Sequence, residues 1–192
     1  MLNRENVLKK SYIKDYNGFD FEELSNISKI NLRGNSADKN FITNVGKILN
    51  TLIPIEPNTS NSNDLLKIIW LSPNEWLINF FDNNIFNETL IKLNNKLNSE
   101  KTSITDVSES KTIIRVIGNE INQLLRKFMI LDIDNVLLNN SKVAQTIFVK
   151  IPILITRNHN DETKKSYDIY VNRSHTIYLR DLLVDGCNQL IN

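Results

Sequence analysis

The chain has 192 residues, a formal net charge of +1 at pH 7 and 41% hydrophobic residues. This length can bury one sizeable core, or two small and tightly packed halves, without a disulfide or a metal ion. The balanced charge, with no run of five basic residues, argues against a protein that coats nucleic acid or an anionic membrane.

The first 26 residues show no sustained hydrophobic period, although Phe19-Asp20-Phe21 contains two aromatic residues. We expect an N-terminal arm here that lies over a surface or a partner. Because this segment also lacks the apolar core of a secretion signal, we expect a cytosolic protein. Residues 27–192 are predicted to form the folded part, in two halves of roughly 27–108 and 109–192.

The first half opens with a strand predicted around Ile30, which stops at Arg33-Gly34. Asn35 or Ser36 could cap the helix that follows, through a side-chain oxygen. We expect Leu52-Ile53-Pro54 to end this helix, because the residue before a proline disfavours helical geometry. The apolar positions at helical spacing are Phe41, Val45, Ile48, Leu49 and Leu52.

Both tryptophans lie in the next apolar segment, residues 69–78, which follows a polar loop at residues 55–64. Ser72-Pro73-Asn74 divides this segment. Proline fixes φ at a value that suits a turn, and Asn accommodates the backbone angles of the following turn position. Two β-branched and aromatic runs joined in this way predict a β-hairpin. Trp70 and Trp76 are expected in the core, and exposure of an indole edge to a partner is the alternative.

A second helix after Asp82-Asn83-Asn84 and a strand at Ser103–Ser108 complete the first half. The apolar stripe of this helix is Phe86, Leu90, Leu93 and Leu97. The order β-α-β-β-α-β is the ferredoxin-like, or split βαβ, pattern, which packs two helices on one face of an antiparallel sheet.

The second half repeats part of this order. A strand at residues 112–117 ends in Gly118-Asn119, and a helix around Leu124 follows it. Three more strands are predicted at residues 144–150, 151–157 and 167–171, before a final helix that Ser174 could cap. The fold class is therefore predicted to be α+β, with two ferredoxin-like halves.

Few residues of the sequence suggest a catalytic or metal-binding role. Cys187 is the single cysteine, and with His159 and His175 as the two histidines there is no zinc-site spacing. His175 follows Ser174, but sequence neighbours do not create a nucleophile and base pair, so both histidines are expected to be structural or on the surface. Cys187 is expected to be a buried, inert thiol.

No glycine-rich phosphate loop of either nucleotide-binding type occurs in the sequence. Asp132 and Asp134 alternate with Leu131 and Ile133, which could place two carboxylates on one strand face. Solvated charges are the simplest interpretation of this pair, and a metal or acid/base site is the alternative. The residues alone therefore indicate a binding or structural role.

Seven short motifs occur in a definite order along the chain. They are Leu32-Arg33-Gly34, Ile53 to Asn58, Trp70 to Leu77, Asp106-Val107-Ser108 with Arg115 and Gly118, Ala144-Gln145-Thr146, Asn172-Arg173-Ser174, and Tyr178 to Leu183. In this order they resemble the gamma subunit of heterotetrameric sarcosine oxidase, from about Ile27 to the C-terminus.

The resemblance implies a bacterial, cytoplasmic subunit that folds like the folate-binding domain of glycine-cleavage aminomethyltransferases. It implies alpha, beta and delta subunits as partners, in a complex that oxidatively demethylates sarcosine to glycine, with tetrahydrofolate as one-carbon acceptor and hydrogen peroxide as product. It also implies that FAD, FMN, NAD and tetrahydrofolate are held by other subunits. For this chain we expect no catalytic, cofactor-binding or metal-binding residues.

Five motif residues are candidates for the partner interface, because arginine and large aromatic side chains are enriched in binding hot spots. They are Arg33, Trp76, Arg115, Arg173 and Tyr178. Two other functions stay open. One is a free-standing, tetrahydrofolate-dependent enzyme resembling an aminomethyltransferase, for which Asp106 is the candidate carboxylate, and the other is a scaffold of another complex.

Overall fold

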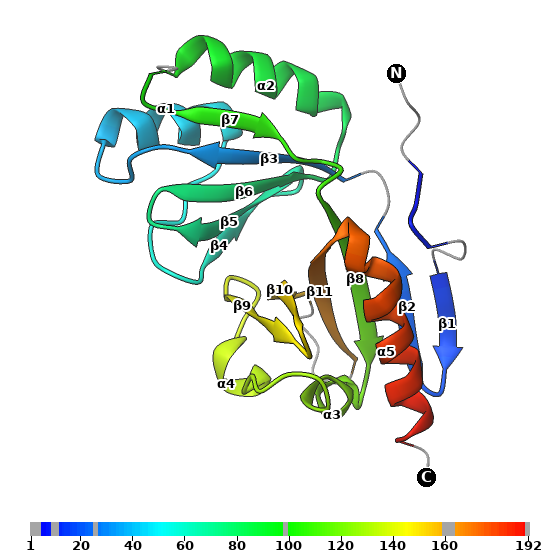
Figure 1. Ribbon diagram of the computed structural model, residues 1–192. Helices are drawn as coiled ribbons and strands as arrows, with labels where there is room; N and C mark the ends of the chain where they lie inside the picture. The colour runs from blue at the N-terminus through cyan, green and yellow to red at the C-terminus, as the bar shows by residue number, and fades with distance from the viewer. Residues whose placement is uncertain (1–4, 9–11, 25–26, 98–99, 159–163, 191–192) are drawn as a thin grey trace. The chain divides into compact units, whose positions relative to one another are not determined.

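The computed structural model describes residues 5–8, 12–24, 27–97, 100–158 and 164–190. The chain forms two compact units, of which one comprises residues 26–108 and the other combines residues 1–25 with 109–192. Each unit contains an antiparallel sheet with helices packed on it (Figure 1). The predicted α+β class is therefore confirmed.

The unit of residues 26–108 has the predicted split βαβ order, with one added edge strand. Its strands are β3 (Ser28–Arg33), β4 (Ser60–Ser62), β5 (Leu66–Ser72), β6 (Glu75–Phe80) and β7 (Ser103–Asp106), in the sheet order β4-β5-β6-β3-β7. Its helices, α1 (Lys39–Leu49) and α2 (Asn84–Lys96), lie on one side of the sheet (Figure 1). Phe41 and Val45 of α1 and Leu93 of α2 pack with strand residues in one hydrophobic core.

Helix α1 begins and ends at other residues than predicted. Its N-cap is Asp38, whose carboxylate accepts hydrogen bonds from the amides of Asn40 and Phe41 at 2.9 and 3.3 Å. The caps predicted at Asn35 or Ser36 are wrong, because Asn35 instead closes a turn by accepting from the Ala37 amide.

The predicted end of this helix is also wrong. The helix ends at Leu49, where Asn50 takes left-handed backbone angles with φ of 49° and terminates it before Pro54 is reached. Leu52 therefore lies beyond the helix and is 81% exposed.

The tryptophan hairpin is confirmed. Strands β5 and β6 pair with Trp70 opposite Trp76, and Pro73-Asn74 forms the connection. Trp76 is fully buried, and its indole nitrogen donates a hydrogen bond of 2.8 Å to the Pro54 carbonyl. Because a buried indole N–H needs a partner, this bond attaches the segment after α1 to the sheet.

The other unit has a sheet in the order β1-β2-β8-β11-β10-β9. Its strands are β1 (Tyr12–Tyr16), β2 (Phe19–Glu23), β8 (Lys111–Gly118), β9 (Val143–Phe148), β10 (Ile151–Arg157) and β11 (Lys165–Asn172). Its helices are α3 (Ile121–Arg126), α4 (Ile133–Val136) and α5 (Thr176–Asn188). Helix α5 runs along one face of this sheet (Figure 1), and its Leu179 and Leu183 join the core there.

Residues 12–23, expected to belong to an arm, are strands β1 and β2 of this sheet. Phe19 and Phe21 are buried, and β2 pairs with β8. Gly18, with φ of 81°, makes the turn between β1 and β2. An alternation of five residues is too short to stand out as a period, which is why the sequence pattern did not predict these strands.

Two polar predictions in this unit are corrected. Asp132 is the N-cap of the short helix α4 and accepts from the Asn135 amide, so Asp132 and Asp134 do not share a strand face. Asp134 pairs instead with Arg126 at 2.7 Å. Ser174 does not cap α5, because a 3-10 turn, η1 (Arg173–His175), leads directly into that helix.

Candidate partner interface

In the parts of the chain that the structure describes, no three His, Cys, Asp or Glu side chains gather where they could hold a metal ion. His159 lies outside the described residues, and His175 is half-buried beside the exposed Ser174. Over the same described ranges, no helix is both long and apolar enough to cross a membrane.

Cys187 is fully buried on α5, as predicted. Burial raises the pKa of its thiol to about 11. Because the thiolate is the reactive form, this cysteine is inert at neutral pH.

Asp106, the candidate carboxylate of the folate-enzyme alternative, is exposed at the end of β7. Its Oδ1 accepts hydrogen bonds from the amide and the hydroxyl of Ser108, at 2.9 and 2.5 Å. This carboxylate therefore stabilises the turn that leaves the strand.

Arg115, one of the five interface candidates, is held within its own sheet. It lies on β8 between Glu22 of β2 and Asp168 of β11. Its Nε and Nη2 donate to the Asp168 carboxylate at 2.7 and 3.0 Å. Burial opposes the guanidinium charge, but the hydrogen bond and the charge of Asp168 outweigh it and raise the pKa of Arg115. Arg115 therefore stabilises the pairing of these strands.

Arg173 is also engaged within its own unit. Its guanidinium donates to the Glu5 carbonyl at 2.6 Å and pairs with the Glu109 carboxylate at 2.9 Å. These contacts connect the N-terminal segment, the start of the 109–192 portion and the entry to α5.

Trp76, another interface candidate, lies in the core of its own unit. Its side chain has no exposed surface and packs against Phe41, with ring centroids 5.6 Å apart. Because this side chain has no exposed surface, it offers no contact area to a partner in this fold. Trp76 is a core residue.

Arg33 and Tyr178 are exposed, in different units. Arg33 pairs with Glu75 across β3 and β6 at 3.0 Å, while its side chain stays 56% exposed. Tyr178 lies on α5 and is 44% exposed, beside Ile177 at 50%. These two residues retain the accessibility that a partner contact requires.

A patch of exposed apolar side chains lies near α5, and the motif analysis missed it. Ile130 is fully exposed, and Ile147 and Val149 are exposed by 59% and 42%. We call these three residues the turn patch. They come from the segment after α3 and from the β9–β10 hairpin, and no local sequence signal distinguishes them from core residues.

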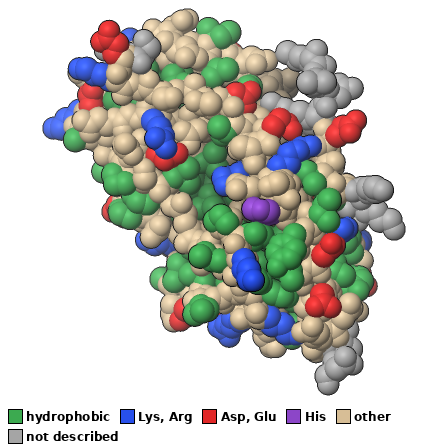
Figure 2. Space-filling model, in the orientation of Figure 1, with side chains coloured by type: hydrophobic (Ala, Val, Ile, Leu, Met, Phe, Trp, Pro, Cys, Tyr) green, Lys and Arg blue, Asp and Glu red, His purple; other side chains and the backbone are tan. Residues whose placement is uncertain are grey.

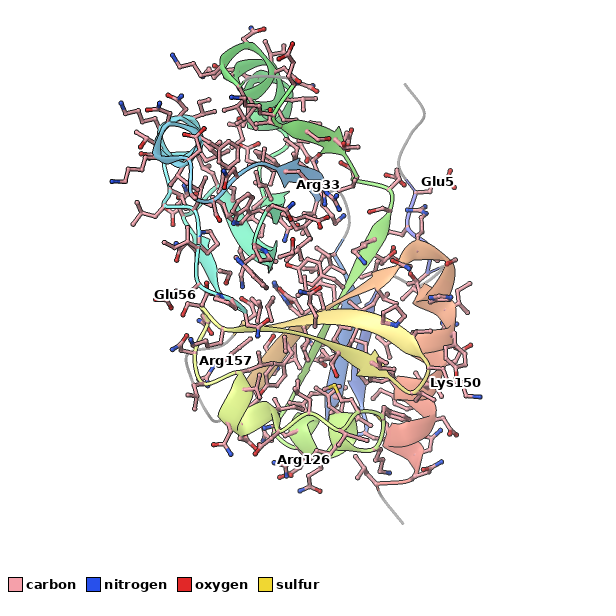
Figure 3. The ribbon with its side chains drawn as sticks, turned by 60° about the vertical axis from the view of Figure 1, so that its left-hand side comes forward. Glu5, Arg33, Glu56, Arg126, Lys150 and Arg157 are labelled. Atoms are coloured by element: carbon pink, nitrogen blue, oxygen red, sulfur yellow. The ribbon has the colours of Figure 1, made fainter. Side chains whose placement is uncertain are left out.

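Contacts of Phe128 place the turn patch beside α5. The Val149 amide donates to the Phe128 carbonyl at 2.8 Å, and the Phe128 ring stacks on Phe148 with centroids 4.9 Å apart. The same ring would lie 2.5 Å from a Cβ added to Gly186 of α5. Figure 3 shows Lys150, at the tip of this hairpin, pointing outward next to α5.

The turn patch is also a place of backbone strain. Val149 has φ of 57°, a left-handed conformation that is unfavourable for a β-branched residue. The turn patch is therefore a candidate contact surface.

Exposed hydrophobic side chains also occur elsewhere on the surface. Figure 2 shows hydrophobic side chains exposed among charged ones on the face in view.

Comparisons with known proteins identify relatives of this chain. The sequence model of the family described as "Sarcosine oxidase, gamma subunit family" matches residues 33–189. A chain of heterotetrameric sarcosine oxidase from Corynebacterium sp. U-96, in complex with pyrrole 2-carboxylate, has a similar structure with a TM-score of 0.80 and 18% identity. The match covers 93% of this chain and 88% of that chain.

A second similar structure is the glycine cleavage system aminomethyltransferase T from Bartonella henselae. Its TM-score is 0.58 at 11% identity, covering 85% of this chain but only 45% of that chain. At such identities the two structures establish a shared fold. A comparison with curated protein sequences finds no significant match.

Proposed function

Because this chain belongs to the sarcosine oxidase gamma subunit family, we propose that it is a noncatalytic subunit which contributes assembly and stability to a heterotetrameric complex. The family match over residues 33–189 is the observation that carries this proposal. The complex would oxidatively demethylate sarcosine to glycine, pass the one-carbon unit to tetrahydrofolate and release hydrogen peroxide. Alpha, beta and delta subunits are the partners, and the cytoplasm is the location.

The cofactors of this complex, FAD, FMN, NAD and tetrahydrofolate, belong to the other subunits in our proposal. The positions of the glycines in this chain support the assignment of these cofactors to other subunits. Glycines of dinucleotide sites let phosphates approach the backbone. Here, three glycines instead accept phenylalanine rings of the same unit, because a Cβ at each would lie within 2.6 Å of a ring atom. The pairs are Gly34 with Phe41, Gly118 with Phe19, and Gly186 with Phe128.

The proposed role also agrees with how the polar side chains are used. Arg115, Arg173 and Asp106 are engaged in strand pairing, in chain connections and in a turn. The side chains of the turn patch are apolar, so they can supply contact area to a partner but no catalytic group. Surfaces of this kind become buried in stable assemblies, whose interfaces are more apolar than the rest of the surface.

Co-purification tests the proposal. This chain would be tagged and coexpressed with the neighbouring genes, and the absorbance spectrum and sarcosine oxidation of the eluted material would be recorded. We expect a yellow, active complex, and a colourless, inactive chain when it is expressed alone. Tight flavin binding by the isolated chain, or the absence of any partner, would overturn the proposal.

The likeness to aminomethyltransferase T favours one second candidate, a tetrahydrofolate-dependent enzyme that acts alone. Calorimetric titration of tetrahydrofolate into the pure chain tests it, and a titration without heat rules it out. Heat that persists in an Asp106→Asn variant would remove Asp106 from the binding site. A scaffold of another complex is distinguished by genes for the other three subunits lying next to this one.

A further inference from the structure

A groove lies along the C-terminal half of α1, in the unit of residues 26–108. Its volume is about 530 Å³. Ile42, Gly46 and Lys47 of α1 form one wall, and Thr51, Leu52 and Ile53 of the following segment form the other. We call this feature the α1 groove.

The rim of the α1 groove carries an exposed apolar side chain on a well-anchored backbone. Leu52 is 81% exposed, whereas Ile53 next to it is buried. The side-chain Nδ2 of Asn61 donates to the Leu52 carbonyl at 2.9 Å, and the side-chain Nδ2 of Asn63 donates to the Thr51 hydroxyl at 2.7 Å. With the bond from Trp76 to Pro54, these contacts hold the segment in one conformation. A preorganised apolar group loses little entropy when a partner binds it.

Gly46 lies at the floor of the α1 groove, and the packing around it leaves room for a side chain. Gly46 lies inside α1, where glycine costs about 1 kcal/mol relative to alanine. A Cβ added there would meet only the Thr51 carbonyl oxygen, at 3.4 Å, which is ordinary contact. The three glycines packed against phenylalanine rings are different, because a side chain would clash there. The space above Gly46 is therefore available to another molecule.

The charge of the groove favours an anionic occupant. Among the described residues that line it, Lys47 carries the charge, and it lies in the last turn of α1. A cation beside apolar walls is complementary to a carboxylate flanked by apolar side chains.

We propose that the α1 groove binds a segment of a partner subunit, which places an apolar side chain over Gly46 against Leu52 and a carboxylate beside Lys47. This inference rests on the proposed function, since it names the surface by which the chain contacts its complex. It adds a second contact surface to the turn patch, which belongs to the other unit.

Cysteine labelling in the coexpressed complex tests this proposal. Leu52→Cys places a thiol on the groove rim, and Ile91→Cys on α2, where Ile91 is 60% exposed, is the matched control. The native Cys187 is fully buried and gives little background. A maleimide should label both variants in the isolated chain. In the complex, labelling of Leu52→Cys should be lost while labelling of Ile91→Cys is retained.

Other results overturn the inference in distinguishable ways. Equal labelling of Leu52→Cys in the free chain and in an assembled complex overturns the groove and leaves the proposed function intact. If no complex forms with the wild-type chain, the proposed function fails, and the inference fails with it. Protection of Leu52→Cys in a concentrated solution of the isolated chain would assign the groove to a second copy of this chain.

A charge reversal tests the carboxylate contact. A Lys47→Glu variant that folds normally should assemble more slowly, and unchanged assembly would refute this contact.

Discussion

Arg115 and Asp168 face each other across β8 and β11 and form two hydrogen bonds, of 2.7 and 3.0 Å. The side chains are only 27% and 11% exposed. Arg33 and Glu75 form a similar cross-strand pair in the other unit, with Arg33 56% exposed. The two pairs have the same chemistry and differ in burial, which makes them a matched set.

Removing the buried arginine should cost more stability than removing the exposed one. Arg115→Met leaves the Asp168 carboxylate buried without its counter-charge, and we expect a loss of about 2–3 kcal/mol. Arg33→Met should change the free energy of unfolding by less than about 1 kcal/mol, because water screens that pair. Urea unfolding of both variants measures the difference. Equal losses would show that burial does not set the strength of these pairs.

Asp20 should make stability depend on pH in the acid range. The Asp15 amide donates to its carboxylate, and with Lys164 nearby these contacts lower the pKa of Asp20, against the opposing effect of burial. A carboxyl group whose pKa is lower in the folded state stabilises the protein above its unfolded pKa, near 4, and this contribution is lost as pH falls through the folded pKa.

An Asp20→Asn variant should therefore be less stable than the wild type at pH 7, and the two should converge as the pH falls below about 4. Unfolding free energies measured from pH 7 to pH 3 test this. Asp64→Asn, at an exposed position, is the control for removal of a surface carboxylate. A constant difference for Asp20→Asn would assign its effect to packing instead of charge.

Cys187 should react with a maleimide only when its unit opens. The thiol is fully buried and its pKa is raised to about 11, so the thiolate is scarce in the folded chain at pH 8. Since the folded pKa is raised, this group stabilises the protein below its unfolded pKa, and that contribution is lost as pH rises towards about 11. Labelling rates at increasing urea should follow the unfolding curve. Fast labelling without denaturant would contradict the buried position.

Two helical glycines should respond to alanine in opposite directions. In α5, a Cβ at Gly186 would lie 2.5 Å from the Phe128 ring, so we expect Gly186→Ala to destabilise the chain by about 1–3 kcal/mol. In α1, Gly46→Ala meets ordinary contacts and should stabilise it by up to about 1 kcal/mol. Chemical denaturation of both variants decides this. Destabilisation by Gly46→Ala would mean that α1 needs the glycine for its own packing.

Trp76 and Trp70 offer a test of the hairpin. Trp76→Phe leaves the Pro54 carbonyl without its indole donor, for an expected loss of about 1–3 kcal/mol including the desolvated acceptor. Trp70 is only half-buried, and Trp70→Phe should cost less. Thermal unfolding compares them. Full stability of Trp76→Phe would show that the indole hydrogen bond does not hold the segment after α1 to the sheet.

Local patterns predicted the parts of the fold whose signals lie within a few residues. Pro73-Asn74 between two apolar runs is sufficient for the β5–β6 hairpin, and the spacing of Phe41 and Val45 is sufficient for α1. The start of that helix could not be predicted, because Asn35, Ser36 and Asp38 can all accept from a helix amide. The choice depended on which of them was already engaged in the preceding turn.

The candidate interface was the part least accessible to prediction. Motif membership selected Trp76 and Arg115, which contribute to the core and to strand pairing. Ile130 and Leu52 look like core residues in the sequence, yet both are largely exposed. Whether an apolar or charged side chain is buried depends on strands distant in sequence, and periodicity does not contain that information.

The sequence by itself determined the α+β class, the split βαβ order of residues 27–108 and the family, because strand and helix periods and an ordered set of short motifs are local properties. The tertiary structure alone decided that residues 12–23 join the sheet of the C-terminal portion, and that Gly46 and Leu52 border an open groove. Each of these outcomes depends on contacts between residues far apart in the chain, and packing selects among them.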